Sequence, residues 1–294
     1  MVSCWGSSFA LRKLLIRPKQ VRWYSEHVAN GLIFDKLKGD YAGIVTIGLN
    51  RPQQKNAIST HLLQQLTKAL DKVYCDNAAR VLIFHSLAPG AFCAGADLKE
   101  RAEMPPKEVS TFVTSLRSLI KRVHDISIPV IAALDGIALG GGLELALAAD
   151  IRIASSNAKM GLVETKLAIM PGAGGTQFLP RTVSSSVAKE LIFTAKIIDS
   201  QTAEKLGLVN HVVDQNETNN AAYLQSLELA ETILPNGPLG IKMAKKAINR
   251  GVEVDLSSGL AIEEACYAQL IPTKDRIEGL QAFNEKRKPI YLGY

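Results

Sequence analysis

The chain has 294 residues, 47% of them hydrophobic, so it can bury a sizeable core and is not disordered as a whole. Its longest apolar stretch, residues 128–149, contains two acidic residues and four glycines, which excludes a membrane-spanning helix there. The four cysteines lack C-x-x-C or histidine-paired spacing, so neither a disulfide framework nor a metal site is predicted.

The start of the chain has the composition of a mitochondrial targeting segment. Residues 1–24 contain five Lys or Arg, and no acid precedes Glu26. We therefore predict a transit peptide and flexible leader over residues 1–31 and a location in the mitochondrial matrix. Because removing residues 1–24 takes away five positive charges and no negative ones, the formal net charge falls from +6 to +1. A nearly neutral mature chain argues against a nucleic-acid-binding protein.

Strands and helices alternate along the central part of the chain. Strands are predicted at residues 43–49, 81–84 and 128–134, and helices at residues 59–74 and 106–124. The strands are apolar throughout rather than alternating, so we expect helices on both faces of a parallel sheet built from right-handed β-α-β units. The predicted class is α/β.

The strand pattern ends near residue 221. Four helical segments follow, at residues 223–233, 239–250, 256–267 and 273–283. Breaks rich in Pro and Gly separate them. We predict a core domain over residues 32–220 and a helical region over residues 221–294.

A glycine-rich run at residues 139–147 follows a predicted strand and opens a helix. Its three consecutive glycines let another molecule approach the backbone, and the free N–H groups of a helix N-terminus suit an oxyanion or a phosphate. Tight packing between strand and helix explains the glycines equally well. Glu144 favours a functional site, because burial in this apolar helix would raise its pKa toward the range used in general acid–base catalysis. The alternative role of Glu144 is to complement the helix dipole.

Two further segments carry weaker signals. Glu164 precedes the glycine-rich turn at residues 171–175, and by itself could be a capping or surface residue. Ala94, Gly95 and Ala96 leave backbone N–H groups open to a ligand. Asp97, with Glu100 three residues later, is predicted to cap a helix. An amide from this segment and one from the triple glycine, if brought together, would form an oxyanion hole.

These motifs together resemble the crotonase, or enoyl-CoA hydratase/isomerase, superfamily over nearly all of residues 32–294. The segments that carry the resemblance are residues 50–52, 55–57, 92–99, 138–146 and 171–177. It implies a crotonase (ClpP-like) spiral of β-β-α units followed by a C-terminal α-helical oligomerisation region. Residues 158–169 and 259–269 are most similar to the methylglutaconyl-CoA hydratase branch, which acts in leucine degradation and binds AU-rich RNA.

The resemblance also implies roles for individual residues. The backbone N–H groups of Ala96 and Gly141 would hold the thioester oxygen, Glu144 would activate water, and Glu164 would donate a proton. Further substrate or CoA contacts are implied for Lys55, Ala57, Ala94, Asp97, Leu98, Lys99, Gly140, Phe283 and Lys286. Of these, Phe283 and Lys286 would reach the CoA of a neighbouring subunit, and a solvated surface charge would explain each lysine equally well. CoA enters as part of the substrate, and no metal or other cofactor is expected.

The expected reaction is addition of water across the 2,3 double bond of a short, branched enoyl-CoA, converting 3-methylglutaconyl-CoA to 3-hydroxy-3-methylglutaryl-CoA. In the superfamily, members that only isomerise double bonds often lack one of the two carboxylates, so the pair favours hydration. The alternatives are a general short-chain enoyl-CoA hydratase of fatty acid β-oxidation and an RNA-binding protein with residual hydratase activity. No motif identifies a cation for the distal carboxylate of a methylglutaconyl group.

Partners follow from the same resemblance. They are the acyl-CoA substrate and further copies of the chain, in a trimer or a hexamer made of two trimers, with no membrane. The helix that begins near residue 59 retains only Lys68 of the three spaced lysines associated with RNA binding. We therefore expect any RNA affinity to be weak and steeply salt-dependent.

Overall fold

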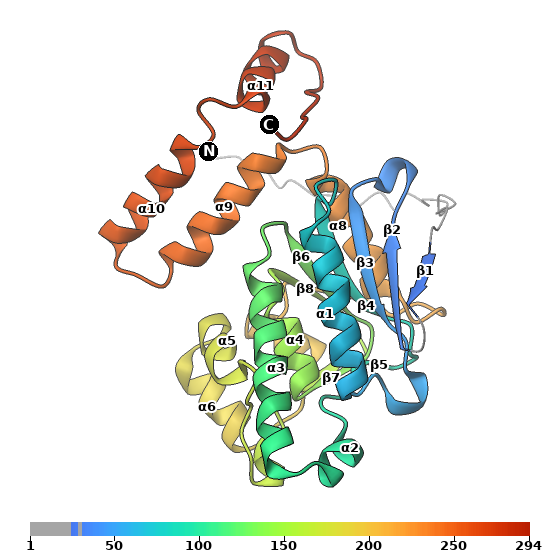
Figure 1. Ribbon diagram of the computed structural model, residues 1–294. Coiled ribbons are helices and arrows are strands. Elements are labelled where there is room, and N and C mark those ends of the chain that lie inside the picture. The colour runs from blue at the N-terminus through green and yellow to red at the C-terminus, as the bar shows by residue number, and fades with distance from the viewer. Residues whose placement is uncertain (1–24, 29–30) are drawn as a thin grey trace, which may run out of the picture.

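The computed structural model describes residues 25–28 and 31–294. Most of the predicted leader lies outside these residues. Residues 25–28 form the first strand, β1 (Ser25–Val28), which pairs antiparallel with β2 (Leu32–Lys36). Figure 1 shows a body of sheets and helices from which the last helices project at one end.

Two sheets form the body. The larger contains, in spatial order, β1, β2, β3 (Ile44–Leu49), β4 (Val81–Ser86), β6 (Val130–Leu134), β8 (Ile151–Ser155) and β11 (His211–Val213). From β3 onward its strands are parallel. The smaller contains β10 (Ile198–Asp199), β9 (Lys159–Gly161), β7 (Ile137–Leu139) and β5 (Ala91–Cys93). The sequence did not predict this second sheet, because two- and three-residue strands leave no periodic pattern.

Helices cover both faces of the larger sheet, which explains its continuous apolar strands. Along β4, Leu82 and Phe84 pack in one buried cluster with residues of α1 (Thr60–Tyr74) and α3 (Pro106–Asp125). The alternate residues Val81 and Ile83 pack in a second cluster with α8 (Ala221–Ile233). Successive side chains of a strand point to opposite faces, so both faces are apolar. The predicted α/β class and these helices are confirmed.

The remaining elements are short. The helices are α2 (Leu98–Glu103), α4 (Gly141–Leu147), α5 (Gly175–Thr182), α6 (Ser185–Phe193) and α7 (Ser200–Lys205), and the 3-10 turns are η1 (Gly39–Tyr41), η2 (Pro52–Gln54) and η3 (Glu164–Leu167). Every residue of α4 is buried, as its apolar composition predicted.

The C-terminal helices are those predicted. After α8 come α9 (Pro238–Gly251), α10 (Leu256–Ala268) and α11 (Lys274–Asn284). Although the predicted division groups α8 with this region, α8 packs on the sheet, and two amides at its start donate to the buried Asp135 carboxylate. Figure 1 shows α9 and α10 side by side and α11 far from α2 and α6. Over residues 31–294, no helix is both long and apolar enough to cross a membrane.

Candidate active site

A cavity of about 430 Å³ lies where α2, α3 and α4 meet the segment between β9 and α5. Seven of the predicted site residues line it: Ala94, Ala96, Leu98, Gly140, Gly141, Glu144 and Glu164. These residues come from three separate stretches of the chain, and the packing of β5, β7 and β9 in the smaller sheet brings the stretches together.

Two backbone amides approach each other at this cavity. Ile58 N donates to Gly95 O at 2.7 Å and Asp97 N donates to Ile58 O at 3.0 Å. Because backbone groups alternate in direction along an extended segment, the intervening Ala96 N–H points away from Ile58. Gly141 is the first residue of α4, so its N–H has no acceptor within the helix. A Cβ placed on Gly141 would lie 3.8 Å from the Ala96 nitrogen, so the two amides can serve one oxygen atom.

The three consecutive glycines have different roles: one allows close packing of α4 on β5, and another leaves the backbone open to the cavity. A Cβ on Gly142 would lie 2.3 Å from the Cys93 carbonyl oxygen, so the close approach of α4 to β5 requires a glycine there. Gly140 has a φ of +50°, a left-handed conformation that glycine adopts without strain. A Cβ on Gly141 would meet no backbone atom nearer than the Ala96 nitrogen at 3.8 Å. The packing interpretation therefore holds for Gly142, and Gly141 remains open toward the cavity.

Glu144 is held by a different segment of the chain. Its side chain is buried, and its Oε1 accepts hydrogen bonds from Ala173 N and Gly175 N, both at 2.8 Å. Burial raises the pKa of Glu144, while the two amides and the positive charge of Arg117 oppose the shift. No hydrogen bond within residues 31–294 uses Oε2, which leaves that oxygen available to a water molecule.

Glu164 lies in η3, against the backbone of Gly140. A Cβ on Gly140 would lie 3.3 Å from Glu164 Oε1, so the carboxyl group is next to the amides described above. Glu164 Oε2 is buried and has no hydrogen-bond partner in the described part of the chain. Burial raises the pKa of Glu164 to about 7, and the negative charge of Glu144 adds to the shift. The pKa of Glu164 is thus raised toward neutral pH by burial, whereas Glu144 keeps amide donors that favour its ionised form.

Several predicted contacts lie outside the cavity lining. Asp97 occupies the N-cap position of α2, but its side chain makes no cap hydrogen bond and pairs instead with Arg51 at 3.4 Å. The predicted capping box is therefore wrong, since Glu100 accepts from Thr60 N rather than from Asp97 N. Lys55, Ala57 and Lys99 also lie outside the lining, although the Lys55 carbonyl accepts from Ala94 N and so borders it.

Phe283 and Lys286 lie at the end of α11, outside this cavity. Phe283 is 83% exposed, and Figure 1 places α11 far from α2. This position agrees with the expectation that the pair would serve a neighbouring subunit's CoA, which stays a prediction.

Some lining residues were not identified from the sequence. They are Arg101, Val113, Leu116, Arg117, Leu167, Ile169 and Met170. Val113 and Arg117 are four residues apart on one face of α3, which is a pattern visible in the sequence. Their approach to Gly172 depends on tertiary packing: Arg117 Nε donates to Gly172 O at 2.8 Å.

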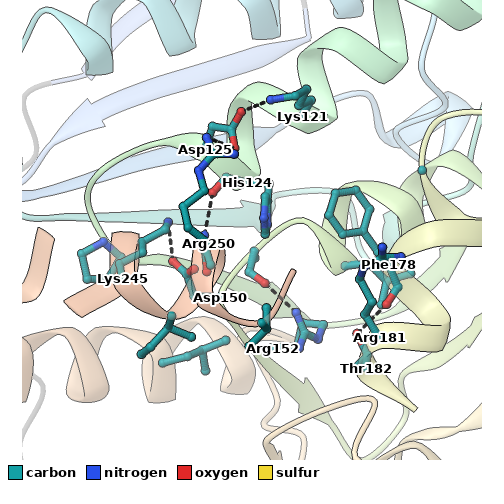
Figure 2. Close-up of a pocket in the computed structure, with 18 of the residues that line it drawn as sticks. Lys121, His124, Asp125, Asp150, Arg152, Phe178, Arg181, Thr182, Lys245 and Arg250 are labelled. Carbon is teal, nitrogen blue, oxygen red and sulfur yellow. Dashed lines mark hydrogen bonds and ion pairs between the residues drawn. The ribbon is translucent and has the colours of Figure 1, made fainter. Parts of the chain in front are cut away.

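A second cavity, of about 1110 Å³, lies beneath α9 (Figure 2). All three carboxylates that line it are ion-paired. Lys245 Nζ lies 2.7 Å from Asp150 and Arg250 lies 3.9 Å from Asp125, and Figure 2 labels these residues. The third, Glu253, pairs with Arg181. The second cavity therefore offers no pair of unpaired carboxyl groups comparable to Glu144 and Glu164. Nor do the described residues contain a cluster of three His, Cys, Asp or Glu side chains that could hold a metal ion.

Known proteins share this arrangement of sequence and fold. The chain matches the enoyl-CoA hydratase/isomerase family over residues 39–293. It is 58% identical over 257 residues to the mitochondrial methylglutaconyl-CoA hydratase of Mus musculus, a match that covers 87% of this chain and 82% of the mouse protein. The chain belongs to the enoyl-CoA hydratase/isomerase family.

Other members of the family agree. A probable mitochondrial enoyl-CoA hydratase 2 of Arabidopsis thaliana is 53% identical over 259 residues, covering 88% of this chain and 85% of that protein. The crystal structure of an enoyl-CoA hydratase from Bacillus anthracis superposes with a TM-score of 0.83 at 44% identity, covering 94% of this chain and 100% of that chain. The predicted family and crotonase fold are confirmed. The mitochondrial location is confirmed by relatives that are mitochondrial by name.

Proposed function

We propose that this enzyme adds water across the 2,3 double bond of a short enoyl-CoA, with 3-methylglutaconyl-CoA as substrate and 3-hydroxy-3-methylglutaryl-CoA as product. The observation that carries the proposal is the presence in one cavity of two converging amides, the buried Glu144 carboxyl group and the half-buried Glu164 carboxyl group. The relative named methylglutaconyl-CoA hydratase, at 58% identity, supports this substrate.

The proposed mechanism follows from the positions of these groups. The N–H groups of Ala96 and Gly141 hold the thioester oxygen and stabilise the negative charge that develops there as water adds to Cβ. Losing one such donor costs about 3 kcal/mol in comparable oxyanion holes, so polarisation of the thioester carbonyl contributes much of the lowering of the activation barrier. Glu144 takes a proton from the attacking water, and Glu164 gives a proton to Cα. The amide donors on Glu144 and the raised pKa of Glu164 favour this division of roles. Apart from CoA, which belongs to the substrate, the mechanism uses no cofactor.

A panel of crotonyl-CoA, tiglyl-CoA and 3-methylglutaconyl-CoA tests the proposal. We expect hydration of all three, with the highest kcat/KM for 3-methylglutaconyl-CoA, measured as loss of absorbance of the conjugated thioester. If crotonyl-CoA were the best substrate, the general short-chain hydratase would be the better assignment. Absence of hydration with every substrate would contradict the enzyme class itself.

We also propose that the enzyme is a homo-oligomer built through its C-terminal helices, as a trimer or a pair of trimers. Large apolar side chains are exposed there: Ile248, Leu256, Leu260, Tyr267, Ile277, Leu280 and Phe283. Apolar residues grouped in this way favour burial against another subunit. Weak RNA binding stays a prediction, and the catalytic cavity is the better supported site.

A double variant tests the oligomer. Leu256 and Leu260 are four residues apart on α10, 79% and 54% exposed, so Leu256→Glu with Leu260→Glu places two charges on one face. We expect the mass measured by light scattering to fall toward that of a monomer, because buried charges oppose association. Lys189→Glu, on the exposed surface of α6, makes the same change in net charge and should leave the mass unaltered. An unaltered mass in the double variant would contradict an interface through α10.

A further inference from the structure

A dicarboxylic acyl group would meet two acids in the candidate active site. The distal carboxylate of a 3-methylglutaconyl group is two carbons beyond Cβ, the atom that Glu144 and Glu164 are proposed to flank. Glu164 already has a raised pKa, caused by burial and by the charge of Glu144. A third carboxylate in the same cavity would be repelled as well, since like charges within a few ångströms disfavour one another. Such a substrate therefore needs a cation in the cavity wall.

Two cationic side chains line this cavity in the described part of the chain, Arg101 and Arg117. Arg101 is on α2, directly after the Ala96 amide and the segment expected to follow the CoA chain, and its guanidinium lies 5.8 Å from the centre of the Phe112 ring. Because it follows that segment, we expect Arg101 to lie near the CoA chain rather than near the distal end of the acyl group.

Arg117 is on α3 and lies close to the loop that holds Glu144. Its Nε donates to Gly172 O at 2.8 Å, and the next residue, Ala173, donates its own N–H to Glu144 Oε1. One loop thus holds both the guanidinium and the carboxylate. The positive charge of Arg117 also acts on Glu144, where it stabilises the ionised form.

The terminal N–H groups of Arg117 make no hydrogen bond within residues 31–294. Its hydrogen bond uses Nε, and no carboxylate of those residues forms an ion pair with it. A guanidinium that is fixed through one nitrogen keeps two terminal nitrogens, whose N–H groups match the two oxygens of a carboxylate. Arg117 is exposed, so water screens its charge until an acyl group fills the cavity.

We propose that Arg117 receives the distal carboxylate of the acyl group and makes the site selective for dicarboxylic enoyl-CoA substrates. The inference rests on the proposed function, because it requires that the double bond be hydrated between Glu144 and Glu164. It assigns to Arg117 a role in substrate choice, separate from the proton transfers.

The test compares kcat/KM for 3-methylglutaconyl-CoA and crotonyl-CoA in the wild-type enzyme and in Arg117→Gln. We expect the ratio of the two values to fall by about 10- to 100-fold, the range of one charge-assisted interaction. Any general loss of activity through Glu144 or the fold cancels in this ratio. Arg117→Lys should recover part of the ratio, because lysine keeps the positive charge. The recovery should be incomplete, because lysine lacks the planar guanidinium that donates two parallel hydrogen bonds to a carboxylate.

Two further variants complete the experiment. Arg122→Gln, on the same helix but paired with Asp71 outside the cavity, should keep the wild-type ratio. Arg101→Gln should keep it as well, and a selective fall in Arg101→Gln instead of Arg117→Gln would overturn the assignment. An unaltered ratio in Arg117→Gln would also overturn it. Failure of the proposed function is distinguishable in the wild-type enzyme, which would then hydrate neither substrate or would prefer crotonyl-CoA.

Discussion

Glu144→Gln is expected to lower kcat for hydration by about 10²- to 10⁴-fold, the usual contribution of a positioned general base. The substituted amide cannot take a proton from water. Its carbonyl oxygen can still accept from Ala173 N and Gly175 N, the two bonds that hold Glu144 Oε1. The loop before α5 should therefore keep its place, and the loss should be seen in kcat more than in KM.

The control for this variant separates chemistry from folding. Glu190→Gln, on the exposed surface of α6, removes the same charge away from the cavity and should leave kcat unaltered. Thermal unfolding and CoA binding of Glu144→Gln should remain near the wild-type values. Wild-type turnover in Glu144→Gln would remove Glu144 from the mechanism.

Glu164→Gln is expected to lower kcat by a similar factor, because Cα then lacks its proton donor. The wild-type enzyme should lose activity as pH rises above about 7, where Glu164 loses its proton. At low pH, activity should fall because Glu144 becomes protonated. In Glu164→Gln the small residual rate should keep the acidic limb of this profile and lose the alkaline limb. An alkaline limb that persists unshifted in the variant would assign that ionisation to another group.

Stability provides a second measurement on Glu164→Gln. Burial raises the pKa of Glu164 to about 7 in the folded protein, against 4.5 for an exposed glutamate. Between these values the folded state binds more protons than the unfolded state, so the stability contributed by this group is present below pH 4.5 and is lost as pH rises through 7. The neutral glutamine avoids that loss. We expect the Tm of the variant to exceed that of the wild type at pH 8 and to match it at pH 4.5; an equal difference at both pH values would contradict a raised pKa.

Local patterns in the sequence predicted much of the fold. The apolar runs that became β3, β4 and β6, and the periodic segments that became α1, α3 and α8 to α11, lie within a few residues of the predicted ranges. Hydrogen bonds in a helix connect residues four apart, and the buried face of a helix repeats with nearly the same period. A helix therefore appears in the sequence as a regular spacing of apolar residues. Glu144 can be recognised from the sequence for the same reason, because it is a single charge in an apolar helix.

Glu164 is a different case. Its neighbours in the chain are compatible with a surface turn, and only its resemblance to a family motif singled it out. Its burial against Gly140, and its coupling to Glu144, join residues that are about twenty positions apart.

The sequence by itself determined the α/β class, the family and the glycines that allow close backbone approach, because each depends on neighbouring residues or on a motif. Only the tertiary structure decided that the Ala96 and Gly141 amides meet, that the Asp97 side chain pairs with Arg51 rather than making a cap hydrogen bond, and that Arg117 reaches the Gly172 loop. The physical reason is that a side chain or an amide finds its partner through packing over long sequence separations. No local period records which distant segment will lie against it.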